Sequence, residues 1–367
     1  LFTLTGCLLT ATAAPKRIMA FIQALVGWLP GGMAIAAICS CTFFTALTGA
    51  SGVTIVALGS LLYPILRQRE YSEKFTLGLV TTSGSLGLLF PPSLPVILYG
   101  VVAQVDIQAL FTASLLPGIM LVIILCFYAF GHTLFRQRSS PQPRLTEPFS
   151  RHKLKRAFFQ SAWDWPIVLI IVIGVYGGFV TIAEVSALVL LYVIVVECFV
   201  LKEIKLFAQM PFVMVEAAVL SGAIIIILGT ALGFTGYLVD EQIPSRILSF
   251  ISGLSSNKYV FLAGLNIFLL AVGCMMDIFS AIVIVVPIIV PVALKFGIDP
   301  IHLGVIFLVN LEIGYATPPV GINLFISSLR FQKPITLLYR ASVPYLLLLL
   351  VALLLITYVP VISLGLL

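Results

Sequence analysis

The sequence predicts an all-α polytopic membrane protein with two inverted repeats, each containing a re-entrant helical hairpin and a broken transmembrane helix. Hydrophobic residues make up 61% of the 367 residues, charged residues only 9%, and the mean hydropathy is +1.19. Soluble domains, by contrast, carry about 25% charged residues. Apolar runs of about 20 residues, long enough to cross a bilayer as a helix, recur along the chain. Two of these runs contain a proline pair, in "GLLFPPSLPVILYG" (87–100) and "GYATPPVGINLF" (314–325).

The longest polar stretch, residues 135–156, shows on which side of the membrane each loop between the spans lies. It holds seven basic residues and one acidic residue, so the positive-inside rule predicts that it is cytoplasmic. Counted from there, seventeen basic residues fall inside and three outside, if Lys16 and Arg17 are inside. The expected single spans are 75–99, 109–130, 166–181, 185–200, 211–237 and 342–359.

Two further apolar regions are too long for one span each. Residues 34–66 and 261–294 carry polar, glycine-containing centres, "TALTGASG" (45–52) and "VGCMMDIFS" (272–280). The charges on both flanks of each region fit one side of the membrane, so we predict helical hairpins that enter and return. The alternative is one long tilted helix with a kink at glycine.

An offset of 227 residues, applied without gaps, indicates an internal repeat. The matched residues are Pro64 with Pro291, Gly87 with Gly314, Pro91 with Pro318, Pro92 with Pro319, and Pro117 with Pro344. An odd number of predicted spans separates the two hairpins, so the second copy is expected to have the opposite orientation. Inverted repeats with discontinuous helices at mid-membrane are typical of secondary transporters.

The predicted organisation follows from these elements. It comprises an N-terminal segment with an amphipathic linker helix (1–32), repeat 1 (33–130), a cytoplasmic basic loop (131–160), middle scaffold helices (161–237), an outer amphipathic linker helix (238–258) and repeat 2 (259–367). The two linker helices are inferred from "KRIMAFIQALVGWL" and "PSRILSFISGL". The chain opens on Leu1 within an apolar segment, and we expect it to lack its own beginning.

The broken helices indicate where binding occurs. Unwound backbone leaves N–H and C=O groups that each cost several kcal/mol in hydrocarbon unless they face protein, water or an ion. Free carbonyls are ligands for small hard cations, and half-helix N-termini attract an anion. Glycine allows close backbone approach, and hydroxyl and amide groups add neutral oxygens.

We therefore predict two cation sites, one in each repeat. The first comprises Thr48, Gly49, Ser51 and Gly52 of the hairpin tip, facing Ser83, Gly84, Gly87, Pro91 and Pro92. The second comprises Gly273, Met276 and Asp277, facing Asn310, Gly314, Thr317, Pro318 and Pro319. The substrate is expected to contact Ser83, Ser85, Pro92, Asn310, Thr317 and Pro319. The alternative is that these glycines and hydroxyls only allow close helix packing.

Acidic residues inside the membrane are functional candidates in their own right. Asp277, at a hairpin tip, and Glu312, inside the second break, are the main ones. We expect Glu184 to cap a helix, and Glu197 and Glu216 to be solvated near the inner ends of their spans. No basic residue falls at mid-membrane, so half-helix ends, hydroxyls and a bound cation are expected to hold a substrate anion.

Other features argue against several classes of function. The six cysteines lie mostly in apolar stretches without metal-ligand spacing, which favours packing. None of the three histidines has a nucleophile or carboxylate at catalytic spacing, and hydrolase, P-loop and dinucleotide signatures are absent from the sequence. We therefore expect neither an enzyme nor an ATP-driven pump, and no organic cofactor. The pI near 9.0 reflects membrane orientation, so no nucleic-acid partner is expected.

Several stretches resemble the large membrane subunit (DctM type) of the tripartite ATP-independent periplasmic (TRAP) transporters. They are "TGASGVTIVALGSLLYP", "GGFVTIAEVSA", "LGLVTTSGSLGLLFPPSLPVILYGVVA", "LFTASLLPG", "IVVPIIVPVALKFGIDPIHLGVIF" and "NLEIGYATPP" followed by "GINLF". The resemblance covers nearly the whole chain. It implies an elevator-type importer of organic anions, usually carboxylates such as C4-dicarboxylates or sugar acids, coupled to two or more sodium ions. It also implies the bacterial inner membrane, a small membrane subunit (DctQ type) and a periplasmic binding protein (DctP type).

The chain departs from the family pattern in three places. The family begins earlier, so one or two N-terminal helices are expected to be missing here. The S-G-S of many first hairpin tips reads Thr48-Gly49-Ala50, although Ser51 can supply the second hydroxyl. The T-P-T-E before the middle helix reads Thr181-Ile182-Ala183-Glu184. A single-chain sodium/dicarboxylate symporter of the same plan, or a channel, is the alternative function.

Overall fold

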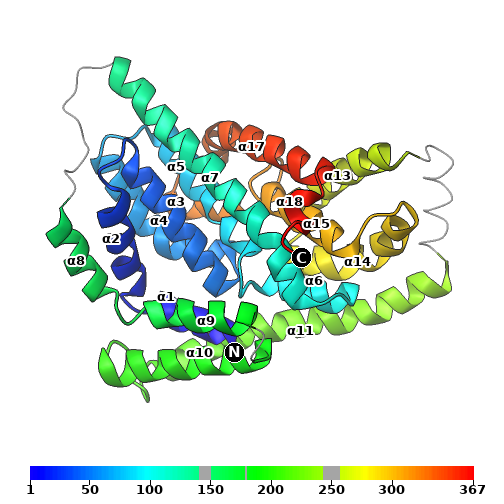
Figure 1. The fold of residues 1–367 in the computed structure, drawn as a ribbon, viewed down its shortest axis with the longest axis horizontal. Coiled ribbons are helices and arrows are strands. Elements are labelled where there is room, and N and C mark those ends of the chain that lie inside the picture. Colours follow the sequence, from blue (N-terminus) through cyan, green and yellow to red (C-terminus); the bar gives the residue numbers. More distant parts are fainter. Residues whose placement is uncertain (140–149, 178–179, 243–256) are drawn as a thin grey trace.

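The computed structural model describes residues 1–139, 150–177, 180–242 and 257–367, and every regular element in these ranges is a helix (Figure 1). The predicted all-α class is confirmed. The helices are α1 (Phe2–Thr10), α2 (Ala14–Val26), α3 (Gly32–Thr48), α4 (Ser51–Gln68), α5 (Glu73–Ser83), η1 (Leu86–Leu89), α6 (Leu94–Ala103), α7 (Ile107–Ser139), α8 (Arg151–Gln160), α9 (Trp165–Gly177), α10 (Ile182–Ile194), η2 (Val195–Val200), α11 (Met210–Asp240), α13 (Lys258–Met275), α14 (Ile278–Lys295), α15 (Pro300–Gly314), α16 (Ile322–Phe331), α17 (Ile335–Tyr358) and α18 (Val361–Leu364).

Six of the described helical segments are long and apolar enough to cross a bilayer, so the chain is a multi-pass membrane protein. They lie in α7, α10 with η2, α11, α13, α14 and α17. Two bent pairs can raise the number to eight: α5–η1 with α6, bent by 46°, and α8 with α9, bent by 71°. The described turns of α11 are mostly exposed, and α9, α10 and α11 form an outer layer along one side (Figure 1).

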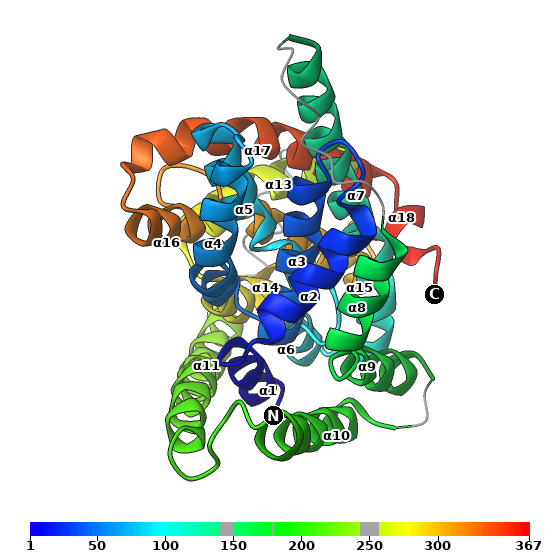
Figure 2. The same cartoon turned by 90° about the vertical axis from the view of Figure 1, so that its left-hand side faces the viewer.

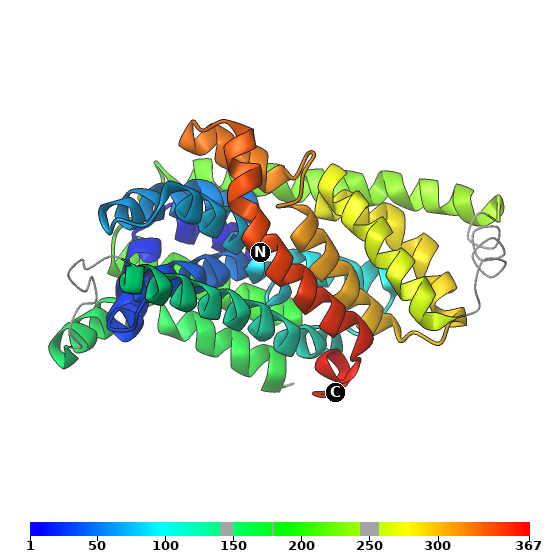
Figure 3. The same ribbon diagram turned by 90° about the horizontal axis from the view of Figure 1, so that it is seen from above.

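Both regions predicted as hairpins contain two helices joined by a two-residue turn. Gly49 and Ala50 separate α3 from α4, which pack against each other, and Met276 and Asp277 separate α13 from α14. A single continuous helix does not form in either region. Gly49 has φ 66°, a left-handed conformation that favours glycine. The two hairpins extend toward opposite ends of the molecule, one blue and one yellow in Figure 3.

Both predicted helix breaks are present at the proline pairs. The first separates α5 and η1 from α6, and the second separates α15 from α16. The Pro91–Pro92 and Pro318–Pro319 peptide bonds are both cis. Every residue of 75–89 and of 302–316 is buried, so the helical segments that lead into the breaks are surrounded by protein. The broken helices therefore form the centre of the fold.

The helix bounds recur with the offset of 227 residues. Adding 227 to the residue numbers of α4 gives the bounds of α14, and adding it to the start of α5 gives the start of α15. In the same way, the starts of α3, α6 and α7 match those of α13, α16 and α17 within one residue. The packing is reciprocal as well. The second hairpin helix α4 packs on α16, and its counterpart α14 packs on α6; α5 packs on α17, and α15 packs on α7. Figure 2 shows α16 beside α4.

The segments between the repeats differ in part from the prediction. The inner linker helix forms as α2, but the basic loop is partly helical, because α7 continues to Ser139 and α8 occupies 151–160. Ser150 starts α8 by accepting a hydrogen bond from the Lys153 amide at 3.4 Å. Residues 140–149 lie outside the described residues, as does most of the predicted outer linker helix (243–256).

Candidate functional site

The first break packs directly against the first hairpin. A Cβ on Gly87 would lie 2.2 Å from the Thr42 carbonyl oxygen, and one on Gly84 would lie 2.6 Å from Ile55 Cγ1. Thr45 Oγ1 lies 2.7 Å from the Gly84 carbonyl oxygen. Only glycine allows these approaches without movement of the hairpin. The structure thus brings this hairpin and this break together, as the sequence predicts.

The tip of the first hairpin contacts both repeats. A Cβ on Gly49 would lie 2.8 Å from Leu94 Cγ, at the start of α6. Ser51 Oγ donates a hydrogen bond of 2.7 Å to Asn323 Oδ1 in the second repeat, and Gly52 approaches Ile326 on the same helix, α16. Gly49 therefore lies toward the first break, Thr48 packs on Gly6 of α1, and Ser51 and Gly52 face the second repeat.

The hydroxyls at the first break bond back onto their own helix. Ser83 Oγ donates to the Leu79 carbonyl at 2.7 Å, and Ser85 Oγ donates to the Thr82 carbonyl at 3.1 Å. Both serines are at most 1% exposed. A hydroxyl that donates its hydrogen keeps its lone pairs, so each oxygen can still coordinate a cation.

Main-chain contacts hold the second hairpin tip to the second break. A Cβ on Gly314 would lie 2.7 Å from Gly273 Cα, and the Gly321 amide donates a 2.9 Å hydrogen bond to the Cys274 carbonyl. The Ile278 amide donates to the Tyr315 hydroxyl. The break itself is partly open, because Thr317 and Pro318 are half-buried and Pro319 is exposed. In the first break, the equivalent Pro92 is buried.

The polar residues predicted for the second site have varied surroundings. Asp277 Oδ1 accepts hydrogen bonds of 3.0 and 3.1 Å from the Phe279 and Ser280 amides, so this carboxylate is the N-cap of α14. Thr317 Oγ1, in the break, donates to the Ile313 carbonyl at the end of α15 at 2.8 Å. The Asn310 amide donates to Asn266 of α13 at 2.8 Å, while its carbonyl oxygen has no hydrogen-bond partner among the described residues.

The other four acidic residues that the sequence singles out each have different surroundings. Glu312 is 1% exposed, and neither of its oxygens has a partner in the described part of the chain. Glu184 forms a capping box with Thr181, as predicted. Glu216 is exposed. The expectation that Glu197 is solvated is wrong: it is 1% exposed, because Arg17 lies 2.8 Å from its Oε1.

Sequence reasoning missed a polar contact between the repeats. Asn323, which accepts from Ser51, donates to the Thr81 carbonyl at 3.5 Å, and Thr81 Oγ1 donates to Ser327 Oγ at 2.8 Å. All four residues are buried. Asn323 and Ser327 are four residues apart, on one face of an apolar helix, and this spacing was the signal available in the sequence.

The donor set suits a hard monovalent cation. Buried hydroxyls, amides and carbonyls surround both breaks, and the buried residues in the described ranges include no lysine or arginine. No group of three or more His, Cys, Asp or Glu is placed to hold a metal ion in these ranges. Transition metals prefer imidazole and thiolate ligands, whereas hard cations bind neutral and anionic oxygens. The oxygen-rich lining of both breaks is therefore of the kind that hard cations bind.

Comparison with models of protein families shows to which family the chain belongs. Residues 1–362 match the family model described as "Tripartite ATP-independent periplasmic transporter, DctM component". The chain belongs to this DctM family. The resemblance seen in the sequence is confirmed, and the chain is similar to TRAP transporter large permeases.

Relatives of this DctM-family chain differ in the substrate for which they are named. It is 36% identical over 365 residues to the C4-dicarboxylate TRAP transporter large permease protein DctM of Pseudomonas aeruginosa, covering 100% of this chain and 84% of that protein. It is 35% identical over 362 residues to the isethionate TRAP transporter permease protein DctMQ of Oleidesulfovibrio alaskensis, covering 98% and 56%. It is 30% identical over 353 residues to the ectoine/5-hydroxyectoine permease UehC of Ruegeria pomeroyi, covering 95% and 80%.

Proposed function

We propose that this DctM-family chain imports organic anions across the bacterial inner membrane, coupled to sodium. One observation carries the proposal. In both repeats an interrupted helix, buried on all sides up to its break, meets the tip or side of a hairpin through glycine contacts. Main-chain groups freed at such breaks can bind ions and a substrate without a buried charged side chain.

Two sodium sites are proposed, one at each break. At the first, the Ser83 hydroxyl and the carbonyls around Gly84 and Gly87 supply neutral oxygens, with Thr48 and Gly49 of the hairpin tip opposite. At the second, the unpartnered Asn310 Oδ1 and the carbonyls around Gly273 and Gly314 are the corresponding groups. Neutral oxygens in these positions match the coordination of a monovalent cation.

The substrate is proposed to lie between the two breaks, in contact with Ser83, Ser85, Pro92, Asn310, Thr317 and Pro319. The relatives are named for C4-dicarboxylates, isethionate and ectoines, compounds that carry a carboxylate or sulfonate group. A small carboxylate, such as a C4-dicarboxylate or a sugar acid, is the class we favour here. Bound sodium and half-helix ends would balance its negative charge.

Transport is proposed to follow an elevator motion of two inverted repeats. The reciprocal packing of α4 on α16 and of α14 on α6 is what a two-fold relation between the repeats requires. In this scheme the hairpins and broken helices move together, and the outer layer of α9, α10 and α11 remains fixed. A small membrane subunit and a periplasmic binding protein are the proposed partners, and the relative named DctMQ supports the first.

Uptake into proteoliposomes tests the proposal. The chain is reconstituted with a DctQ-type small subunit and a DctP-type binding protein, and a panel of radiolabelled carboxylates is supplied under an inward sodium gradient. We expect saturable uptake that requires both sodium and the binding protein. Uptake without the binding protein would favour the single-chain symporter, and a non-saturable flux that ignores sodium would favour a channel.

A further inference from the structure

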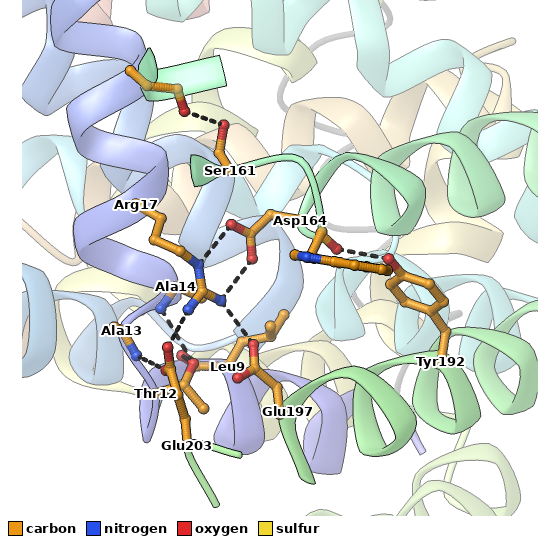
Figure 4. A network of polar contacts seen from close by, with 12 residues as sticks. Leu9, Thr12, Ala13, Ala14, Arg17, Ser161, Asp164, Tyr192, Glu197 and Glu203 are labelled. Atoms are coloured by element: carbon orange, nitrogen blue, oxygen red, sulfur yellow. Dashed lines mark hydrogen bonds and ion pairs between the residues drawn. The ribbon is translucent and has the colours of Figure 1, made fainter. Parts of the chain in front are cut away.

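A buried ion cluster joins α2 to the outer layer of helices (Figure 4). Arg17 Nε and Nη2 each donate a 3.0 Å hydrogen bond to Asp164, one to each carboxylate oxygen. Nη2 also donates to Glu197 Oε1 at 2.8 Å, and Nη1 donates to Glu203 Oε1 at 2.6 Å. These four residues are called the Arg17 cluster below.

The three carboxylates come from three separate segments. Asp164 lies in the turn between α8 and α9, Glu197 lies in the π-helical turn η2, and Glu203 follows that turn. Glu203 Oε2 also accepts a 2.6 Å hydrogen bond from the Ala13 amide, just before α2 begins. The start of α2 is therefore attached through both its main chain and the Arg17 side chain.

The cluster is largely dry. The side chains of Arg17, Asp164 and Glu197 are 12%, 5% and 2% exposed, and that of Glu203, at the edge of the cluster, is 28% exposed. Burial by itself lowers the pKa of the Arg17 guanidinium, but the hydrogen bonds to Asp164 and the attraction of the three carboxylates raise it above its ordinary value. The guanidinium stays charged, and breaking the cluster would leave buried charges without a counterion.

The connection from α2 to the first hairpin is a tight glycine turn. Gly31 has φ 75°, and a Cβ there would lie 2.8 Å from the Ala129 carbonyl oxygen. A Cβ on Gly32, the first residue of α3, would lie 2.1 Å from the Val26 carbonyl oxygen. The turn at 27–32 therefore joins a firmly attached helix to the hairpin that follows, and α2 and α3 also pack on each other.

The contact between this hairpin and the outer layer is different in kind. An apolar cavity of about 380 Å³ lies between α3, the first break, α7 and α9, with Phe43 and Val172 among its lining residues. A loosely packed apolar boundary offers little resistance to sliding, because few contacts are lost when it shifts. The ionic attachment of α2 is to the turn before α9 and to the segment around η2, whereas α3 faces α9 across this apolar cavity.

We propose that the Arg17 cluster is a fixed anchor, which holds α2 on the α8–α10 segment while the first hairpin moves about the turn at 27–32. This inference rests on the proposed transport function. Arg17 is a positioning residue in this scheme: it touches neither sodium nor substrate, and it keeps the base of the moving hairpin in place. Its loss affects the rate of movement more than the affinity for either ligand.

Crosslinking tests the anchor without altering the cluster. In a variant lacking the six native cysteines, Phe21→Cys and Trp165→Cys link α2 to α9, where the two native rings lie 4.8 Å apart. We expect the crosslinked protein to keep uptake within twofold of the same variant before crosslinking. The matched control links Phe43→Cys on α3 to Val172→Cys on α9 across the cavity, and this link should reduce uptake at least tenfold. Arrest by the α2–α9 link would overturn the anchor.

A second test separates turnover from binding. At equal amounts of protein in the membrane, Arg17→Met should lower kcat at least tenfold and leave the KM for substrate and for sodium within twofold. Arg17→Lys, which keeps the charge but not the two-oxygen contact with Asp164, should recover part of the loss. An unchanged kcat in Arg17→Met would contradict the proposed role.

Distance measurements between spin labels test whether α2 stays fixed on α9 if Arg17→Met does not fold or if transport is not observed. Labels at Leu25→Cys on α2 and Ile173→Cys on α9 should give one distance with and without sodium and substrate. Labels at Val56→Cys on α4 and Ile173→Cys should give a second distance when ligands are added. If wild-type uptake fails, the proposed function fails, while a single α2–α9 distance still supports the anchor; several α2–α9 distances overturn it.

Discussion

The two hairpin tips occupy equivalent places in the repeat, yet they are held in different ways. The first hairpin packs on its own break where Gly87 meets Thr42 and Ala46, and its tip also reaches across to the other repeat through one side-chain hydrogen bond, from Ser51 to Asn323 at 2.7 Å. The second is held on its own broken helix by main-chain contacts, between Gly273 and Gly314 and between Gly321 and Cys274. The first break is buried at Pro92, whereas the second is exposed at Pro319.

This difference indicates which tip can be released at lower cost. A neutral hydrogen bond contributes about 1 kcal/mol net, and a ligand can replace it. Close packing of two glycine backbones involves many atoms, and each lost contact adds to the cost of separation. We therefore expect loss of the Ser51 hydrogen bond at the first tip to cost little, and a side chain that fills the Gly314 contact at the second tip to cost much more.

The largest effect is expected at the glycine contact of the second tip. A Cβ on Gly314 would lie 2.6 Å from the Gly273 carbonyl carbon, so Gly314→Val should lower the stability by about 3 kcal/mol through overpacking. Thermal unfolding in detergent measures the loss. Gly264→Ala on α13 is the control, because nothing lies within 4 Å of its Cβ position. An unchanged melting temperature in Gly314→Val would show that this contact is not tight.

Sodium dependence compares the two breaks directly. Ser83→Ala and Asn310→Ala each remove one neutral oxygen, and we expect each to raise the sodium concentration for half-maximal uptake about tenfold, equivalent to about 1.4 kcal/mol. Ser60→Ala, whose hydroxyl bonds to Ala57 on α4, is the control. A shift in only one of the two variants would mean that only one break binds sodium.

The cap at the second tip should have a smaller effect. Because Asp277 Oδ1 accepts two amides at the start of α14, Asp277→Ala should cost about 1 kcal/mol of stability. Asp277→Asn keeps the capping oxygen and should stay close to the wild-type melting temperature. If the Asn variant is as unstable as the Ala variant, the charge matters more than the cap.

An effect no larger than that of the cap is expected at the first tip. Ser51→Ala leaves the buried Asn323 Oδ1 without its donor and should lower stability by about 1 kcal/mol, the low end of the range for an unsatisfied buried acceptor. Ser51→Thr keeps the hydroxyl and is the control. A loss as large as that of Gly314→Val would reverse the order proposed for the two tips.

The positions of the breaks and hairpin turns could be predicted because their causes are local. Proline has no amide hydrogen to donate and disfavours helical geometry in the residue before it, so the two proline pairs mark the breaks, whereas the single prolines Pro64, Pro117 and Pro344 lie inside helices. Gly49 marks the first turn because the left-handed conformation there favours glycine. Glu184 was assigned correctly because its capping partner Thr181 is only three residues away.

The predictions failed for residues whose contact partners are far away in the sequence. Counting spans placed Glu197 near a membrane surface, but its surroundings depend on Arg17, 180 residues earlier in the chain. Asn323 was overlooked because its partner Ser51 is 272 residues away. The predicted role of Asp277 did not include the cap, although an acidic residue before an apolar helix is a local capping signal.

The sequence by itself determined the membrane class, the places where helices stop and the offset that relates the two halves. Hydropathy, proline and glycine act on the residues around them, so their consequences are independent of the rest of the fold. Only the tertiary structure decided that the first tip bonds across to the other repeat, that the second packs on its own break and that Arg17 gathers three carboxylates. Each of these contacts depends on which helices meet in three dimensions, and no local pattern in the chain records that choice.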